Sequence, residues 1–86
     1  MDIKLLDKIE QFRQLKKGDM ILVRWSDYYI KHTKGIKPIM IYDIQKIVGN
    51  EVICQSKNNH YFNYKLYLEK KSAALEIYKI YLKNRG

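Results

Sequence analysis

The spacing of apolar residues along the chain predicts a helix near each end, with strands between them. Residues 3–15 carry apolar side chains three or four positions apart, and Asp2 precedes them as an N-cap. Residues 73–85 carry a similar stripe, which favours a second helix. The β-branched and aromatic residues between positions 75 and 82 also suit a strand, so that alternative stays open.

Between these two segments, residue type and alternation predict strands over residues 19–25, 38–48, 51–57 and 60–64. Gly49-Asn50 is typical of a two-residue hairpin turn, and Asn58-Asn59 predicts a second tight turn. Residues 26–37 lose the alternation and are interpreted as a long loop. Loops of this length in small domains are usually functional.

This order of elements predicts one α+β domain over residues 1–86. We expect a small SH3-like antiparallel β-barrel or meander, flanked by an N-terminal and a C-terminal helix that cover its open ends and edges. A chain of 86 residues has room for one modest core.

The formal net charge of +8 is high for this length and unevenly distributed. Fourteen of the seventeen basic residues are lysine, so composition and solubility explain part of it. The charge nevertheless concentrates in residues 16–37, which sum to +4, and in residues 57–71, which sum to +3. Such segregation is typical of a surface for an anionic partner.

The sequence indicates a cytoplasmic protein that does not act at a membrane. Its apolar runs are too short to cross a bilayer, and acidic residues interrupt the first positions, where a secretory signal would lie. Cys54 is the single cysteine, so no disulfide framework is expected.

Residue types that carry catalysis or bind metals are scattered. Cys54, His32 and His60 lie in separate segments without the spacing of metal ligands. The four glycines lie at turns or at the end of the chain, so no phosphate-binding loop is predicted. Without an acid–base pair held together, we expect no metal, no cofactor, no small-molecule substrate and no enzymatic activity.

Residues 15–25, LKKGDMILVRW, followed by residues 35–41, GIKPIMI, resemble the opening of the MazF/PemK group. These are small SH3-like barrels that cleave RNA as toxins. In that family a Gly-Asp pair begins the first strand and an Arg-Pro pair begins the second. The catalytic arginine of the family would map onto Lys37, and lysine does not reproduce the planar, bidentate guanidinium at a phosphate. The family's later Thr-Ser segment has no match after Ile44. The resemblance therefore implies the fold more than RNA cleavage.

Interleaved basic and aromatic residues predict a non-enzymatic module that binds RNA, DNA or a nucleoprotein complex. The expected binding residues are Lys16, Lys17, Tyr28, Tyr29, Lys31, His32, Lys34, Lys37, Lys57, Lys65, Lys70 and Lys71. Two alternatives remain open. One is a small inhibitor of the phage or mobile-element type, similar in style to anti-CRISPR proteins, that docks on a protein or ribonucleoprotein nuclease. The other is a metal-independent ribonuclease of the MazF/PemK type.

Overall fold

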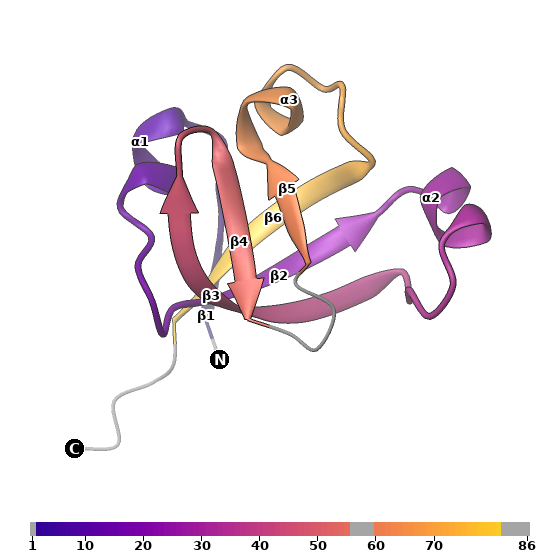
Figure 1. Cartoon of the computed structure of the whole chain (residues 1–86), viewed down its shortest axis with the longest axis horizontal. Coiled ribbons are helices and arrows are strands. Elements are labelled where there is room, and N and C mark those ends of the chain that lie inside the picture. Colours follow the sequence, from indigo (N-terminus) through magenta and orange to yellow (C-terminus); the bar gives the residue numbers. More distant parts are fainter. Residues whose placement is uncertain (1, 56–59, 82–86) are drawn as a thin grey trace.

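The computed structural model describes residues 2–55 and 60–81 and contains one antiparallel sheet of six strands with three short helices (Figure 1). The sheet has the strand order β1-β6-β2-β3-β4-β5. Along the chain the elements are β1 (Asp2–Leu5), α1 (Ile9–Arg13), β2 (Met20–Trp25), α2 (Asp27–His32), β3 (Ile39–Val48), β4 (Glu51–Gln55), β5 (Tyr61–Asn63), α3 (Tyr64–Leu68) and β6 (Ala74–Tyr81). The fold is thus a small α+β domain.

The middle of the sheet follows the prediction. β2 and β3 lie within one residue of the ranges predicted from alternation, 19–25 and 38–48. The β3–β4 hairpin turns at Gly49-Asn50, and Gly49 has a φ of 58°, a conformation that glycine adopts without strain. β4 begins at Glu51 as predicted. The end of its predicted range, with the Asn58-Asn59 turn, lies outside the described residues.

The prediction of an SH3-like barrel is wrong, because the sheet is open. The first half of β3 pairs with β2 and the second half with β4, and the register shifts between Ile44 and Lys46. Within the described residues β1 and β5 are the two edges of the sheet, and no pairing joins them. Closure needs such a pairing, whereas β5 is only three residues long and leads directly into α3.

The predicted helix over residues 3–15 is also wrong in its first half. Residues 2–5 form β1, an edge strand that pairs with β6. The helix begins only at Ile9, because the Gln11 side-chain oxygen accepts hydrogen bonds from the backbone N–H groups of Asp7 (2.7 Å) and Lys8 (2.9 Å). This local cap ends the strand path and starts one short turn of helix.

The predicted helix over residues 73–85 is wrong, because Ala74–Tyr81 form the strand β6. β6 pairs with β1 on one side and β2 on the other. Ile77 packs in the core, and Ile80 is buried on the opposite face of the sheet. A strand with apolar residues on both faces does not show the alternation of a half-buried strand. Its apolar residues can then have the spacing of the apolar stripe of a helix. The three helices therefore lie within the sequence and do not flank the sheet from its ends.

The helix α2 lies within the predicted loop, and the helix α3 begins at the end of a predicted strand. In the segment 26–37, the Ser26 hydroxyl accepts a hydrogen bond from the Tyr29 N–H at 3.2 Å and starts α2. The predicted strand over 60–64 stops at Asn63, whose side-chain oxygen accepts from the Leu66 N–H at 3.0 Å and starts α3. Both are N-caps that satisfy free helix donors.

The main core lies against one face of the sheet, called here the inner face. Ile21, Val23 and Trp25 of β2 point to it, as their alternation predicts, and all three are buried. Phe12 of α1 and the aromatic residues of α3 fill the space between sheet and helices. The described residues contain no helix long and apolar enough to span a membrane.

Candidate functional site

α2 lies at one end of the long axis of the molecule (Figure 1). Two backbone hydrogen bonds fix its base to the sheet. The Trp25 N–H donates to the Pro38 carbonyl oxygen at 2.9 Å, and the Ser26 N–H donates to the Ala73 carbonyl oxygen at 2.9 Å. The helix is therefore held by the segments before β3 and β6 as well as by β2.

Four rings, one on α2 and three beneath it, form what we call the α2-end cluster: Tyr29 on the helix, and Trp25, Tyr42 and His60. Trp25 stacks on Tyr29 with ring centroids 4.4 Å apart, and Tyr42 stacks on His60 at 4.8 Å and an interplanar angle of 6°. An edge contact of 5.4 Å between Trp25 and His60 joins the two pairs. The cluster thereby links β2, β3 and the residue before β5 to the helix.

Burial affects the polar atoms of this cluster. Trp25 Nε1 and the Tyr42 hydroxyl are buried without a hydrogen-bond partner among the described residues. Burial raises the pKa of Tyr42, and the nearby indole of Trp25 opposes that rise in part, although its geometry falls short of a hydrogen bond. Burial lowers the pKa of His60, which favours the neutral imidazole at pH 7.

The outer side of α2 presents a second ring pair to solvent. Tyr28 is 73% exposed, and His32 stacks on it with centroids 4.2 Å apart and an interplanar angle of 23°. His32 Nδ1 lies 2.9 Å from the Tyr28 carbonyl oxygen, so a proton on that nitrogen would complete a hydrogen bond. The contact restrains the imidazole, and the pair forms a fixed aromatic surface on the helix.

Three lysines lie on the same segment as this ring pair. Lys31, Lys34 and Lys37 are exposed, and none of them forms an ion pair within the part of the chain that the structure describes. Asp27 is the one acidic residue between positions 26 and 37. Six of the residues predicted from sequence thus gather at this end of the molecule: Tyr28, Tyr29, Lys31, His32, Lys34 and Lys37.

The other predicted residues lie elsewhere. Lys16 and Lys17 are exposed in the connection before β2, so the length of that strand separates them from α2. Lys65 lies in α3, and Lys70 and Lys71 follow it. Lys71 pairs with Glu69 at 3.6 Å, while Lys57 falls outside the described residues. The described lysines of the two basic segments therefore lie on different elements.

A contrasting group of rings, the α1–α3 cluster, joins Phe12 to Tyr64 and Tyr67. Phe12 stacks on Tyr64 at 5.0 Å and 4°, and meets Tyr67 edge-on at 5.6 Å. The Tyr64 hydroxyl donates to the Gly49 carbonyl oxygen at 2.8 Å. Each hydroxyl in this cluster has a partner, as buried polar groups usually do.

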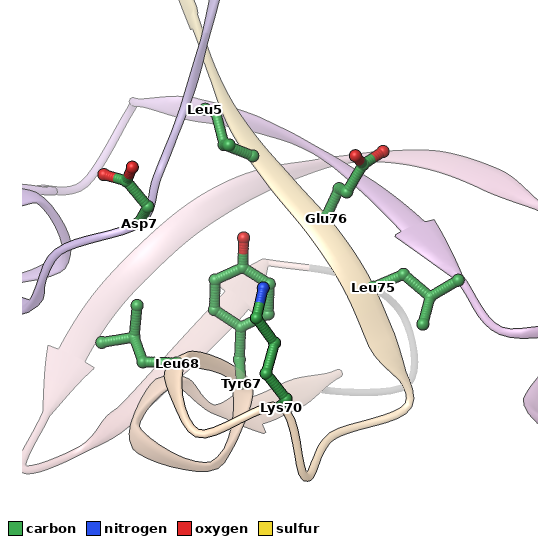
Figure 2. Close-up of a pocket in the computed structure, with 7 residues that line it drawn as sticks. All are labelled: Leu5, Asp7, Tyr67, Leu68, Lys70, Leu75 and Glu76. Carbon is green, nitrogen blue, oxygen red and sulfur yellow. The ribbon is translucent and has the colours of Figure 1, made fainter.

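A hollow of about 220 Å³ lies above Tyr67, between the end of β1 and β6 (Figure 2). Figure 2 shows the Tyr67 hydroxyl directed toward the space between Leu5 and Glu76. That hydroxyl donates to the Leu6 carbonyl oxygen at 2.8 Å and accepts from the Ile77 N–H at 3.1 Å. The polar group at the floor of the hollow therefore serves the fold.

The thiol of Cys54 is fully buried in β4. Burial, together with repulsion from the Asp43 carboxylate, raises the pKa of Cys54 to about 12, so the reactive thiolate is disfavoured. The described residues hold no group of three or more His, Cys, Asp or Glu side chains that could ligate a metal ion.

The Gly-Asp pair that suggested the MazF/PemK group has a local structural role. The Asp19 carboxylate accepts from the Lys16 N–H at 3.0 Å and forms an ion pair with Lys79 at 3.8 Å. Comparison of the chain with family models, curated proteins and solved structures finds no match. The resemblance of residues 15–41 to that group therefore stays a prediction.

Proposed function

We propose that this protein is a non-enzymatic module that binds single-stranded nucleic acid through the α2 end of the molecule. The observation that carries the proposal is the exposed Tyr28–His32 ring pair with lysines on the same segment. Aromatic faces stack on unpaired bases, and lysines contact the phosphates that connect those bases. Both kinds of contact are independent of sequence.

The ring pair supports stacking in particular. A base that stacks on an exposed aromatic ring contributes about 1–3 kcal/mol. Because His32 already stacks on Tyr28, little side-chain entropy is lost when a base adds to the exposed side of the pair. Tyr29 packs on Trp25 beneath them and holds the helix in place.

The charges favour a single strand over base-specific reading of a duplex. Three lysines that release counterions from single-stranded nucleic acid predict a slope of about −2 for log affinity against log salt concentration. Arginine, the commonest reader of guanine in the major groove, is absent from residues 26–37. We therefore expect modest affinity with little preference for sequence.

Fluorescence anisotropy with labelled single-stranded RNA, single-stranded DNA and duplex DNA over a salt series tests the proposal. We expect binding to both single strands, weakened by salt with the slope above, and weaker binding to the duplex. Tyr28→Ala should lower affinity by about 5- to 100-fold, which corresponds to the loss of one stacked base.

Matched controls lie at other ends of the molecule. Tyr81→Ala removes an equally large, partly exposed ring from the end of β6, and Lys65→Gln removes a lysine from α3. Neither should alter affinity by more than about twofold, whereas Lys34→Gln should reduce the salt slope by about 0.7. Failure of all three oligonucleotides to bind at low salt would overturn the proposal, as would equal losses from Tyr28→Ala and Tyr81→Ala.

A further inference from the structure

The outer face of the β1-β6-β2-β3 part of the sheet is largely apolar, and its apolar side chains are exposed along both edges. The strand register directs two side chains of β1 and three from each of the other strands to this face. Eight of these eleven are apolar, and Ile39 and Ile41 are 55% and 48% exposed. Ile3 and Leu5 on β1 are exposed as well, and the apolar residues of β6 and β2 between the two edges are half-buried or buried. An apolar face with exposed side chains of this kind marks an interaction surface.

The charge of this face differs from that of the whole molecule. The chain carries +8, but the face holds one cation, Arg24, and two anions, Glu76 and Asp43. Arg24 and Glu76 lie side by side on β2 and β6, with Nη1 and Oε1 3.5 Å apart, and both side chains remain substantially exposed. Such a surface does not suit nucleic acid, and its occupant must be apolar with a complementary charge pair.

We propose that a second copy of this chain binds the outer face, about a two-fold axis that runs parallel to β2 and β6 and passes between them. This rotation lays β2 of one copy over β6 of the other, as in two sheets packed about 10 Å apart. The interface is then isologous, so each contact occurs twice.

The register makes the face complementary to itself under this rotation. Arg24 of each copy faces Glu76 of the other, which converts two long ion pairs into a network of four charges. In the next row toward the start of β2, Leu22 faces Tyr78. Asp43 lies at a corner of the face and stays in water.

The remaining rows match at the centre and at one pair of edges. Met20 faces Ile80 of the second copy, and Leu5 at one edge faces Ile41 at the other. At the corners of the face Ile3 faces the exposed Asp43. The two central strands thus present two apolar rows and one row with a charge pair. A second copy of the same chain carries matching rows in the same order. The face lies on the sheet and not on α2, so a dimer through it does not depend on the proposed function.

The face is small, so the dimer is reversible. Eleven residues are about half of the 20–30 that each partner contributes to a standard interface. We expect a dissociation constant on the order of 10 µM. Because two chains of +8 repel each other, added salt should tighten the dimer, while it weakens nucleic-acid binding.

Sedimentation velocity of the full chain from about 5 to about 500 µM brackets this value. We expect a transition from monomer to dimer that shifts to lower concentration in high salt. A protein that remains monomeric over the whole range would overturn the proposal and leave the face for a different protein.

Charge reversal then tests the arrangement of the two copies. Arg24→Glu or Glu76→Arg alone sets like charges opposite each other and should raise the dissociation constant at least about tenfold. An equimolar mixture of the two variants restores both intermolecular pairs, so it should form a dimer. Loss of the ion pair within each chain cannot explain that recovery.

Lys71→Glu is the matched control, because it breaks a similar exposed ion pair of 3.6 Å, with Glu69, away from the face. Its dissociation constant should not rise, because Lys71→Glu lowers the net charge of each copy from +8 to +6 and leaves the face unchanged. Circular dichroism should show that all variants are folded. Single reversals that dimerise normally, or a mixture that stays monomeric, would contradict the proposed pairing.

Discussion

The two aromatic clusters of this small domain contain similar rings, but the polar atoms of these rings differ in their hydrogen bonding. In the α1–α3 cluster the hydroxyls of Tyr64 and Tyr67 donate to backbone carbonyl oxygens. In the α2-end cluster Trp25 Nε1 and the Tyr42 hydroxyl are buried without a described partner. An unsatisfied buried polar group costs about 1–3 kcal/mol, so we expect the second cluster to be the less stable of the two.

This difference distinguishes the α1–α3 cluster, which supports the fold, from the cluster at the candidate site. The α1–α3 cluster connects three parts of the chain by side-chain hydrogen bonds, and its own three rings are buried. The α2-end cluster supports an exposed ring pair and three lysines without ion pairs among the described residues. Local instability and exposed aromatic groups are common where ligands bind.

The largest expected effect comes from a matched pair of hydroxyl deletions. Tyr67→Phe leaves the Leu6 carbonyl and the Ile77 N–H without their partner and should lower the free energy of unfolding by about 2 kcal/mol. Tyr42→Phe removes a hydroxyl that has no hydrogen bond among the described residues, so its stability should stay within about 0.5 kcal/mol. Urea denaturation of both variants measures the contrast.

Equal losses of stability in the two variants would show that Tyr42 is as well satisfied as Tyr67, and the comparison would then fail. The ring is retained in each substitution, so packing changes little. The difference between the two results therefore reports the hydrogen bonds alone.

How much of this fold the sequence predicts depends on where each strand lies. β2, β3 and β4 follow from alternation and from the Gly49 turn, because only their inner face is packed in the main core. β6 does not, because it is central and carries apolar residues on both faces. β1 has no alternating burial at all, and its pairing with β6 decides its conformation.

The sequence predicts the residues of the candidate site, but it does not predict the helix that carries them or the ring stack they form. The density of lysine and tyrosine over residues 26–37 identified the segment. A six-residue helix is too short to show periodicity, although Ser26 before Asp27 is an N-cap signal and Lys31 and His32 suit the last turn. The stack of Tyr28 on His32 follows from their spacing of four once the helix is known.

The pH dependence of stability tests the burial of His60 in the weaker cluster. Burial lowers the pKa of His60, so below about pH 6.5 the unfolded chain binds a proton that the folded chain resists. Stability should be full above pH 6.5 and should fall as the pH decreases through the folded pKa, by at most about 1.4 kcal/mol per pH unit.

His60→Phe keeps a ring on Tyr42 and removes the titration. The difference in melting temperature between the unmodified chain and this variant should therefore change between pH 7 and pH 5, to the disadvantage of the unmodified chain. A constant difference over that range would mean that His60 is as easily protonated in the folded state as in the unfolded one.

The smallest expected effect is on the rate at which the Cys54 thiol is labelled, which reports local opening of the fold. Cys54 lies beside the α2-end cluster, since its N–H donates to the His60 carbonyl oxygen at 2.8 Å. With a pKa of about 12, its thiolate fraction at pH 8 is about a thousandfold below that of an exposed thiol of ordinary pKa. Labelling by a thiol reagent therefore requires opening. The short edge strand β5 pairs with β4 up to Ile53, directly before Cys54.

If the α2-end cluster opens by itself, Cys54 should be labelled faster than global unfolding allows, and weak urea should accelerate the reaction little. The control places the thiol in central β2, as Val23→Cys with Cys54→Ala, where labelling should follow global unfolding and respond steeply to urea. Identical urea dependence at the two positions would mean that the domain opens only as a whole. The unsatisfied atoms of Trp25 and Tyr42 would then weaken the entire molecule, and the end that presents the exposed rings would be no less stable than the rest.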